Sequence, residues 1–135
     1  MSYDKYFDES YARVVTHPVT DKDFFLVFYH NFISASPEAS KLLENTDLTK
    51  QAQMFKKSFY SLLVFYASNA ADDYLERIAY SHSRAKMTIP PHLYDIWLET
   101  LIETVKMCDP KCCPNVELAW RLVLVGGITY MKFKY

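Results

Sequence analysis

The segment DYLERIAYSH, residues 73–82, sets apolar side chains and one histidine on the same side of a predicted helix. They follow at positions i, i+3, i+4 and i+7: Leu75, Ile78, Ala79 and His82. Asp73 with Glu76 forms a capping-box pattern that predicts the start of this helix. A lone histidine on an apolar helical face is more often a hydrogen-bonded core residue than a ligand. The spacing alone therefore leaves both roles of His82 open.

Helical stripes of the same kind lie on both sides of this segment. Prolines stand near the predicted boundaries, and the only two glycines are Gly126 and Gly127, so long stretches can be helical. The predicted helices cover residues 3–16, 24–32, 37–43, 48–68, 73–82, 91–105 and 115–132. The sequence therefore predicts an all-α fold in one domain, residues 1–135.

Local signals mark several helix starts. Thr20 with Asp23 forms a second capping-box pattern, and Ser36 before Pro37 is typical of an N-cap followed by proline in the first turn. Glycine in a helix costs about 1 kcal/mol relative to alanine. We therefore expect another backbone or a ligand to approach the helix closely at Gly127.

Composition and charge exclude several partners. Fifteen basic and sixteen acidic residues give a net charge of -1 without a basic patch, so nucleic acid and anionic membranes are not expected partners. The N-terminus has no signal-peptide pattern and no apolar run is long enough to span a membrane, which predicts a cytoplasmic protein. Cys108, Cys112 and Cys113 lack paired metal-ligand spacing and are expected to be reduced thiols.

Catalytic motifs are absent as well. The chain has no zinc-protease motif, no glycine-rich phosphate loop and no nucleophile elbow, which excludes hydrolases and nucleotide-dependent enzymes of these types. His17, His30 and His92 have no convincing partner in the sequence. The 11 tyrosines and 9 phenylalanines would suit the lining of a flat cofactor and equally a packed helical core.

Four segments in this order resemble bacterial globins of the single-domain haemoglobin, flavohaemoglobin and globin-coupled sensor lineage. They are FY at 28–29, FYASN at 65–69, IAYSH at 78–82, and PHLY at 91–94 with Trp120 downstream. The resemblance covers nearly the whole chain. It implies a globin fold, a helical sandwich around a pocket for haem b.

The same resemblance implies roles for individual residues. His82 would be the proximal iron ligand, and Tyr29 would donate a hydrogen bond to dioxygen on the distal side. Such a bond is worth roughly 1.5 to 3 kcal/mol, or about ten- to a hundred-fold in affinity. The alternative for Tyr29 is a core tyrosine that donates to a backbone carbonyl. The implied haem pocket comprises Tyr29, Leu43, Phe55, Phe59, Ile78, His82, Ile89, Tyr94 and Leu98.

The chain departs from the family pattern on the distal side. Leu43 replaces the phenylalanine that usually packs on the haem edge. Counting back from Tyr66 places Phe55 at the distal position, which usually carries histidine or glutamine, and Phe59 on the next inward-facing turn. Both side chains are apolar, so Tyr29 would be the only distal donor. The preceding loop differs in length, however, and Gln51 or Gln53 could take the distal place instead.

The proximal side differs too. Counting from Trp120, Tyr135 stands where flavohaemoglobins carry a glutamate that, with a tyrosine like Tyr94, pushes electron density onto the iron. With that change and no reductase domain, a dioxygenase or peroxidase is disfavoured. The candidate partners of the haem propionates are Arg84, Lys86, Lys56 and Arg77, each of which could equally be a solvated surface charge.

The sequence favours a globin that reversibly binds dioxygen, carbon monoxide and nitric oxide, for transport, storage or sensing. Two alternatives stay open: a haem-free globin-like signalling module, and a nitric oxide dioxygenase that works with a separate reductase. A homodimer through the last two helices stays an alternative to a monomer.

Overall fold

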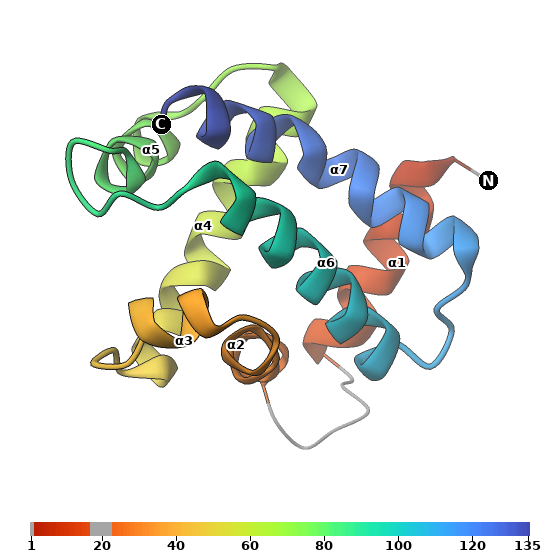
Figure 1. Ribbon diagram of the computed structural model, residues 1–135. Coiled ribbons are helices and arrows are strands. Elements are labelled where there is room, and N and C mark those ends of the chain that lie inside the picture. Colours follow the sequence, from red (N-terminus) through yellow and green to blue (C-terminus); the bar gives the residue numbers. More distant parts are fainter. Residues whose placement is uncertain (1, 17–22) are drawn as a thin grey trace.

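The computed structural model describes residues 2–16 and 23–135, and every regular element in these ranges is an α-helix (Figure 1). The helices are α1 (Tyr3–Thr16), α2 (Phe24–Ala35), α3 (Pro37–Leu42), α4 (Leu48–Ser68), α5 (Asp73–His82), α6 (Pro91–Cys108) and α7 (Pro114–Phe133). The predicted all-α fold class is confirmed. No helix in the described ranges has the length and apolar character needed to cross a bilayer.

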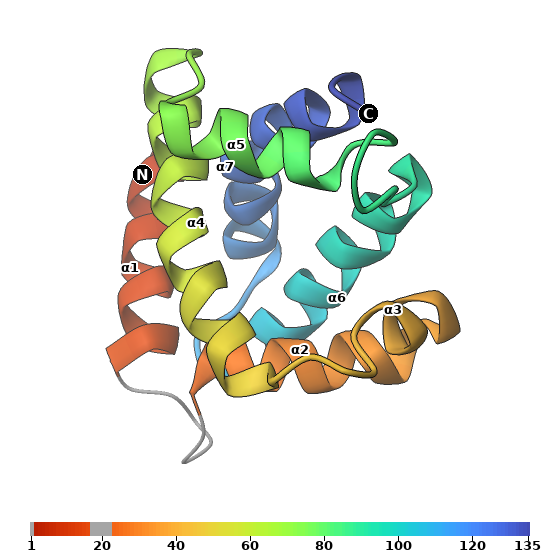
Figure 2. The ribbon, with the colours of Figure 1, turned by 90° about the vertical axis from the view of Figure 1, so that its left-hand side faces the viewer.

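The helices pack on one another around two central helices, α2 and α7. The helix α7 packs on α1, α4 and α6, whereas α2 packs on α3, α4 and α6. Figure 2 shows α4 and α6 as two walls, with α5 across one end and α2 with α3 across the other. Residues far apart in the sequence therefore face one another between these walls.

Acidic and hydroxyl side chains cap the helices. The Asp23 carboxylate accepts hydrogen bonds from the backbone N–H groups of Phe25 and Leu26, and Ser36 accepts one from Ala39, as predicted for its N-cap. Thr20 and His17 lie outside the described residues.

The predicted cap of α5 is wrong by one residue. Asp72, not Asp73, accepts a hydrogen bond from the backbone N–H of Leu75, at 2.7 Å. Asp73 instead lies in the first turn, where a negative charge is favourable near the positive end of the helix dipole. Two neighbouring aspartates offer the same capping chemistry, so the sequence pattern did not distinguish them.

Aromatic rings fill the core between α1, α2, α4 and α7. Trp120 and Phe59 have no exposed surface. The ring of Phe7 meets Trp120 edge-on at a centroid distance of 4.8 Å, and Tyr11 stacks on Phe59 at 5.2 Å. Much of the aromatic content of the chain is therefore used in packing this core.

A buried carboxylate joins α1 to the segment between α6 and α7. Asp109, which follows α6, accepts hydrogen bonds from the Ser10 hydroxyl at 2.6 Å and from the Arg13 guanidinium at 2.6 and 2.9 Å. The Trp120 indole donates to the same Ser10 hydroxyl at 2.9 Å. Burial opposes ionisation of Asp109, but the hydrogen bonds from Arg13 and Ser10 outweigh it and hold the pKa of this carboxyl below its usual value.

Gly127 allows α7 to approach α4. A Cβ at this position would collide with the side chain of Leu62, which is buried on α4. A group does approach closely at Gly127, but it is a leucine side chain, so the expected backbone or ligand is wrong. A glycine here lets the two helices pack more closely than any other residue would allow.

We expect Asp109→Asn to lower the free energy of unfolding by about 2–4 kcal/mol at neutral pH, because Arg13 and Ser10 lose their charged acceptor. The folded-state pKa of Asp109 lies below the unfolded-state value of about 3.9. Its contribution is therefore complete above that value and is lost as the pH falls through the folded-state pKa. Urea unfolding of both proteins at a series of pH values should show a difference that shrinks in acid.

Asp95→Asn is the matched control for this experiment. Asp95 pairs with Lys132 at an exposed site, where an ion pair is worth little, so the control should change stability by less than about 1 kcal/mol. An Asp109 variant as stable as this control would contradict the role of the buried carboxylate.

Candidate functional site

A cavity of about 300 Å³ lies between α2, α4, α5 and α6, with α3 and α7 completing its walls. This volume falls at the lower end of the range of small-molecule sites. Eight of the residues that the sequence pointed to line it: Tyr29, Leu43, Gln51, Phe55, Ile78, His82, Ile89 and Tyr94. The fold therefore gathers most of the predicted site residues around one space.

Three other candidates do not line the cavity. Phe59 lies in the aromatic core against Tyr11 and Trp120. Leu98 is half-buried against the core, and its neighbour Trp97 lines the cavity instead. Gln53 is exposed. They lie outside the cavity because each residue along a helix turns about 100°, so the neighbour of a lining residue faces elsewhere.

The cavity has further lining residues that the sequence reasoning missed. They are Phe32, Leu42, Thr46, Met54, Ser58, Leu62, Tyr74, Leu75, Ser81, Met87, Leu93, Trp97, Ile128 and Met131. On α4 the spacing of the residues could have predicted the lining, because Met54, Phe55, Ser58 and Leu62 follow Gln51 on one side of the helix. Met87 lies between α5 and α6, where no helical periodicity predicts the direction of its side chain. Only the tertiary structure shows that it lines the cavity.

Tyr29 and Gln51 form one side of the cavity. The side-chain amide of Gln51 donates a hydrogen bond to the Tyr29 hydroxyl oxygen at 3.3 Å, a long contact. Within the described residues no backbone carbonyl accepts from this hydroxyl, so its own hydrogen is available to an acceptor in the cavity. Burial raises the pKa of Tyr29 to about 12, against a smaller opposing effect of the Gln51 hydrogen bond. The hydroxyl is therefore neutral at physiological pH.

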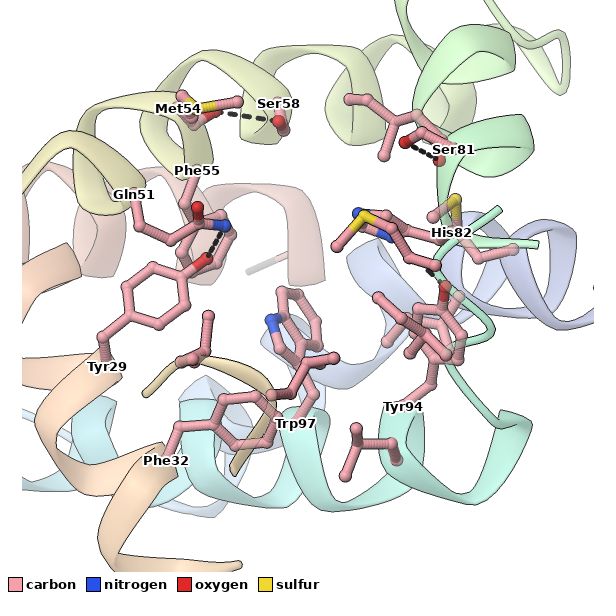
Figure 3. A pocket seen from close by; sticks show the side chains of 18 of the residues that line it. Tyr29, Phe32, Gln51, Met54, Phe55, Ser58, Ser81, His82, Tyr94 and Trp97 are labelled. Atoms are coloured by element: carbon pink, nitrogen blue, oxygen red, sulfur yellow. Dashed lines mark hydrogen bonds between the residues drawn. The ribbon is translucent and has the colours of Figure 1, made fainter. Parts of the chain in front are cut away.

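His82 and Tyr94 form the opposite side. Figure 3 shows the His82 ring directed into the cavity, across from Tyr29 and Gln51. The Tyr94 hydroxyl lies 3.4 Å from Nδ1 of His82. If Nδ1 carries the ring proton, the lone pair of Nε2 is left for the cavity. Burial lowers the pKa of His82, which favours the neutral ring that metal coordination requires.

Two backbone hydrogen bonds fix the end of α5. The backbone N–H of Ile89 donates to the carbonyl of His82 at 3.0 Å, and Met87 donates to Ser81 at 3.1 Å. Met87 and Ile89 themselves line the cavity. The segment that follows α5 thus folds back to hold His82 and adds two apolar walls beside it.

The other histidines of the described ranges, and the cysteines, do not line this cavity. His30 is exposed, and His92 lies on the surface with Nε2 2.7 Å from a Glu38 carboxylate oxygen. None of the three cysteines forms a disulfide: Cys108 is buried, Cys112 is half-buried and Cys113 is exposed. In the described part of the chain, no group of three or more histidine, cysteine or acidic residues could hold a metal ion.

The basic candidates around the cavity contact aromatic rings. The Arg84 guanidinium lies over Tyr135 at 4.8 Å, Lys86 over Tyr80 at 5.6 Å, and Arg77 over Tyr74 at 5.7 Å. Lys56 is exposed. Of these rings only Tyr74 lines the cavity. Arg77 is therefore the basic candidate whose aromatic partner, Tyr74, borders the cavity.

No protein family model matches the chain, and no curated protein sequence matches it. A solved structure does match: protein PA3967 from Pseudomonas aeruginosa PAO1, described as structurally highly homologous to a human hemoglobin. The two chains are 30% identical and superpose with a TM-score of 0.88 over 99% of this chain and 98% of that one. The similarity thus extends over nearly the full length of both chains.

We expect Phe59→Ala to lower the free energy of unfolding by about 3–5 kcal/mol, because it removes a fully buried ring from the aromatic core. Met54→Ala is the control on the same helix. Met54 lines the cavity but is largely exposed, so its loss should cost less than about 1 kcal/mol. Urea unfolding measures both changes, and equal costs would contradict the distinction between core and cavity faces of α4.

Proposed function

This chain belongs to the family of bacterial single-domain globins, and from that premise we propose that it binds haem b in the cavity and a diatomic gas on the haem iron. The gases are dioxygen, carbon monoxide and nitric oxide. One observation carries the proposal: a neutral, inward-directed histidine, His82, faces a buried hydroxyl donor, Tyr29, across an apolar cavity. The helical sandwich that the resemblance implied is confirmed by the shared architecture.

The chemistry of the cavity fits haem. A bare metal ion needs several protein ligands, and the described residues offer no cluster of them. Haem brings the nitrogen ligands of its macrocycle and needs an axial one from the protein. Apolar side chains from six helices line the cavity and would cover the macrocycle, among them Phe55, Leu62, Ile78, Leu93 and Ile128.

On the proximal side, His82 would hold the iron through Nε2. Tyr94, whose hydroxyl faces Nδ1, would set the rotation of the imidazole ring. Burial keeps the ring neutral, so no proton competes for the lone pair. Bound haem would supply an iron that can bind a diatomic gas.

On the distal side, Tyr29 would donate to the bound gas. Its hydroxyl is buried and keeps its proton, since its pKa is raised to about 12. Gln51 would act through Tyr29, by donating to the hydroxyl oxygen and orienting the O–H group. A buried donor of this kind adds roughly 1.5 to 3 kcal/mol when the acceptor carries charge. Dioxygen, which takes up negative charge on ferrous iron, would benefit most.

Reversible binding is favoured over catalysis. In the described chain no aspartate or glutamate lines the cavity, so no carboxylate there would push electron density through His82. Tyr135, which stands at the position of the flavohaemoglobin glutamate, lies under the Arg84 guanidinium and accepts a hydrogen bond from the Arg84 backbone at 3.0 Å. The Tyr135 side chain therefore contributes an aromatic contact with Arg84 and carries no negative charge.

We expect His82→Ala to be purified with little or no haem, because the axial bond is lost and no other described histidine lines the cavity. Absorption at the Soret band relative to protein, with circular dichroism to verify folding, is the measurement. His92→Ala, which alters an exposed histidine, should keep the haem content of the unchanged protein. A full Soret band in folded His82→Ala would refute the assignment.

We expect Tyr29→Phe to keep haem but release dioxygen about ten-fold faster or more, since one buried donor is removed. Stopped-flow dissociation from the ferrous protein measures the rate. Gln51→Leu should have a smaller effect, because Gln51 acts through Tyr29. If the rate of Tyr29→Phe is unchanged and that of Gln51→Leu rises, Gln51 and not Tyr29 is the distal donor.

A further inference from the structure

The cavity opens to solvent where side chains from three separate segments meet. Three of its lining residues are more than a third exposed: Leu42 on α3 by 38%, Met54 on α4 by 55%, and Met87, between α5 and α6, by 52%. Exposed methionines are common at surfaces that bind other proteins, because their flexible side chains adapt to a partner. The opening therefore presents apolar contacts at the place where the interior is reachable from outside.

Basic side chains surround this opening. A lysine directly precedes Leu42 and another directly precedes Met87, and two more lie one helical turn to either side of Met54 on α4. The sequence has no basic run, so only the fold gathers these residues. With the exposed Arg77 of α5 they form a group that we call the basic rim: Lys41, Lys50, Lys57, Arg77 and Lys86.

Two members of the basic rim meet at one ring. The Lys57 ammonium of α4 and the Arg77 guanidinium of α5 lie 4.8 and 5.7 Å from the centroid of the Tyr74 ring. Tyr74 itself lines the cavity. Positive charge from two helices therefore stands directly beside the cavity.

The charge of the basic rim is not neutralised. Within residues 2–16 and 23–135 its five members form no ion pair, whereas Lys106, Arg121 and Lys132 on α6 and α7 each pair with a carboxylate. The cause lies in the sequence, because residues 48–71 and 77–94 contain no aspartate or glutamate. The three acidic residues between these ranges all lie at the start of α5, at its cap or in its first turn. The basic rim is therefore available to an acidic partner.

The chemistry of gas binding points to the kind of partner. Dioxygen binds ferrous haem iron, so iron that has become ferric must regain one electron, and in this respect the inference rests on the proposed function. No cysteine of the described chain lines the cavity, and the sequence has no glycine-rich loop for a nucleotide cofactor. A separate protein that carries electrons would come closest to the haem at the opening.

We propose that the basic rim docks a small acidic electron-transfer protein, which passes one electron to ferric haem. The donor is oxidised by one electron and the iron is reduced from ferric to ferrous, with no transfer of atoms. Opposite charges attract and orient the two proteins, and such steering raises association rates by about 10- to 1,000-fold. Leu42, Met54 and Met87 supply the apolar centre within the charged surround, which is the usual anatomy of an interface.

The complex should be weak and sensitive to salt. Electron-transfer complexes bury little surface, typically less than about 1,200 Å² in total. The side chains of the basic rim are exposed, so salt screens their attraction, over about 8 Å at physiological ionic strength. A short-lived complex also lets one donor serve many copies of the globin.

A binding experiment tests the docking without any turnover, with flavodoxin, a small acidic flavoprotein, as the probe. Microscale thermophoresis of the purified full chain with oxidised flavodoxin should show binding at low ionic strength that weakens as salt is added. Lys50→Glu with Lys57→Glu should raise the dissociation constant at least about ten-fold.

Lys5→Glu with Lys111→Glu is the matched control, because it makes the same change of net charge at exposed positions outside the basic rim. It should leave the dissociation constant nearly unchanged. Equal constants for the two double variants would overturn the proposal. Binding to phosphatidylglycerol vesicles without binding to flavodoxin would overturn it as well, because the basic rim would then be a membrane surface.

Stopped-flow reduction tests the electron transfer in protein whose Soret band shows full haem content. Reduced flavodoxin should reduce the ferric protein at a rate that falls with added salt, and at least about ten-fold more slowly in the Lys50→Glu, Lys57→Glu variant than in the control variant. A purified protein that shows no Soret band even after addition of haem would refute the proposed function and this inference with it. Equal reduction rates in the two haem-loaded variants would overturn this inference alone.

Discussion

The packing of Phe59 against Tyr11 and Trp120 fixes the rotation of α4, and the site depends on that rotation. The ring has no exposed surface and is stacked 5.2 Å from Tyr11. With Phe59 held in the core, the neighbouring face of α4 must turn toward α5 and α6, where Gln51 and Phe55 line the cavity. The contact of Leu62 with Gly127 holds the same helix against α7. A change in the core would therefore displace the distal side of the proposed haem pocket.

Burial sets the electrostatics of the cavity. It lowers the pKa of His82 and raises those of Tyr29 and Tyr94, so all three groups are neutral at physiological pH. Two of them are hydroxyl donors and the third is an imidazole with a lone pair. A neutral apolar cavity suits haem with a small gas when it has one imidazole nitrogen that can bind iron and one hydroxyl group facing it. The same cavity offers little to a charged substrate.

The helix α7 connects the core, the cavity and the outer surface. Trp120 anchors it in the core, Ile128 and Met131 reach the cavity, and Leu122 and Val125 are exposed on its outer side. Asp109, just before α7, joins this helix to α1 through Ser10, Arg13 and the Trp120 indole.

The sequence by itself determined the helices, the inward histidine and the residues that resemble globins, because periodicity and capping act over a few neighbouring residues. Only the tertiary structure decided which side of each helix faces the cavity. Gln51 and Gln53 differ by about 200° around α4, so the packing of Phe59, distant in sequence from its partners, selects Gln51. For the same reason Phe59 and Leu98 turned out to lie outside the cavity. Close contacts between distant segments carry no local signal, and these contacts set the rotation of the helices.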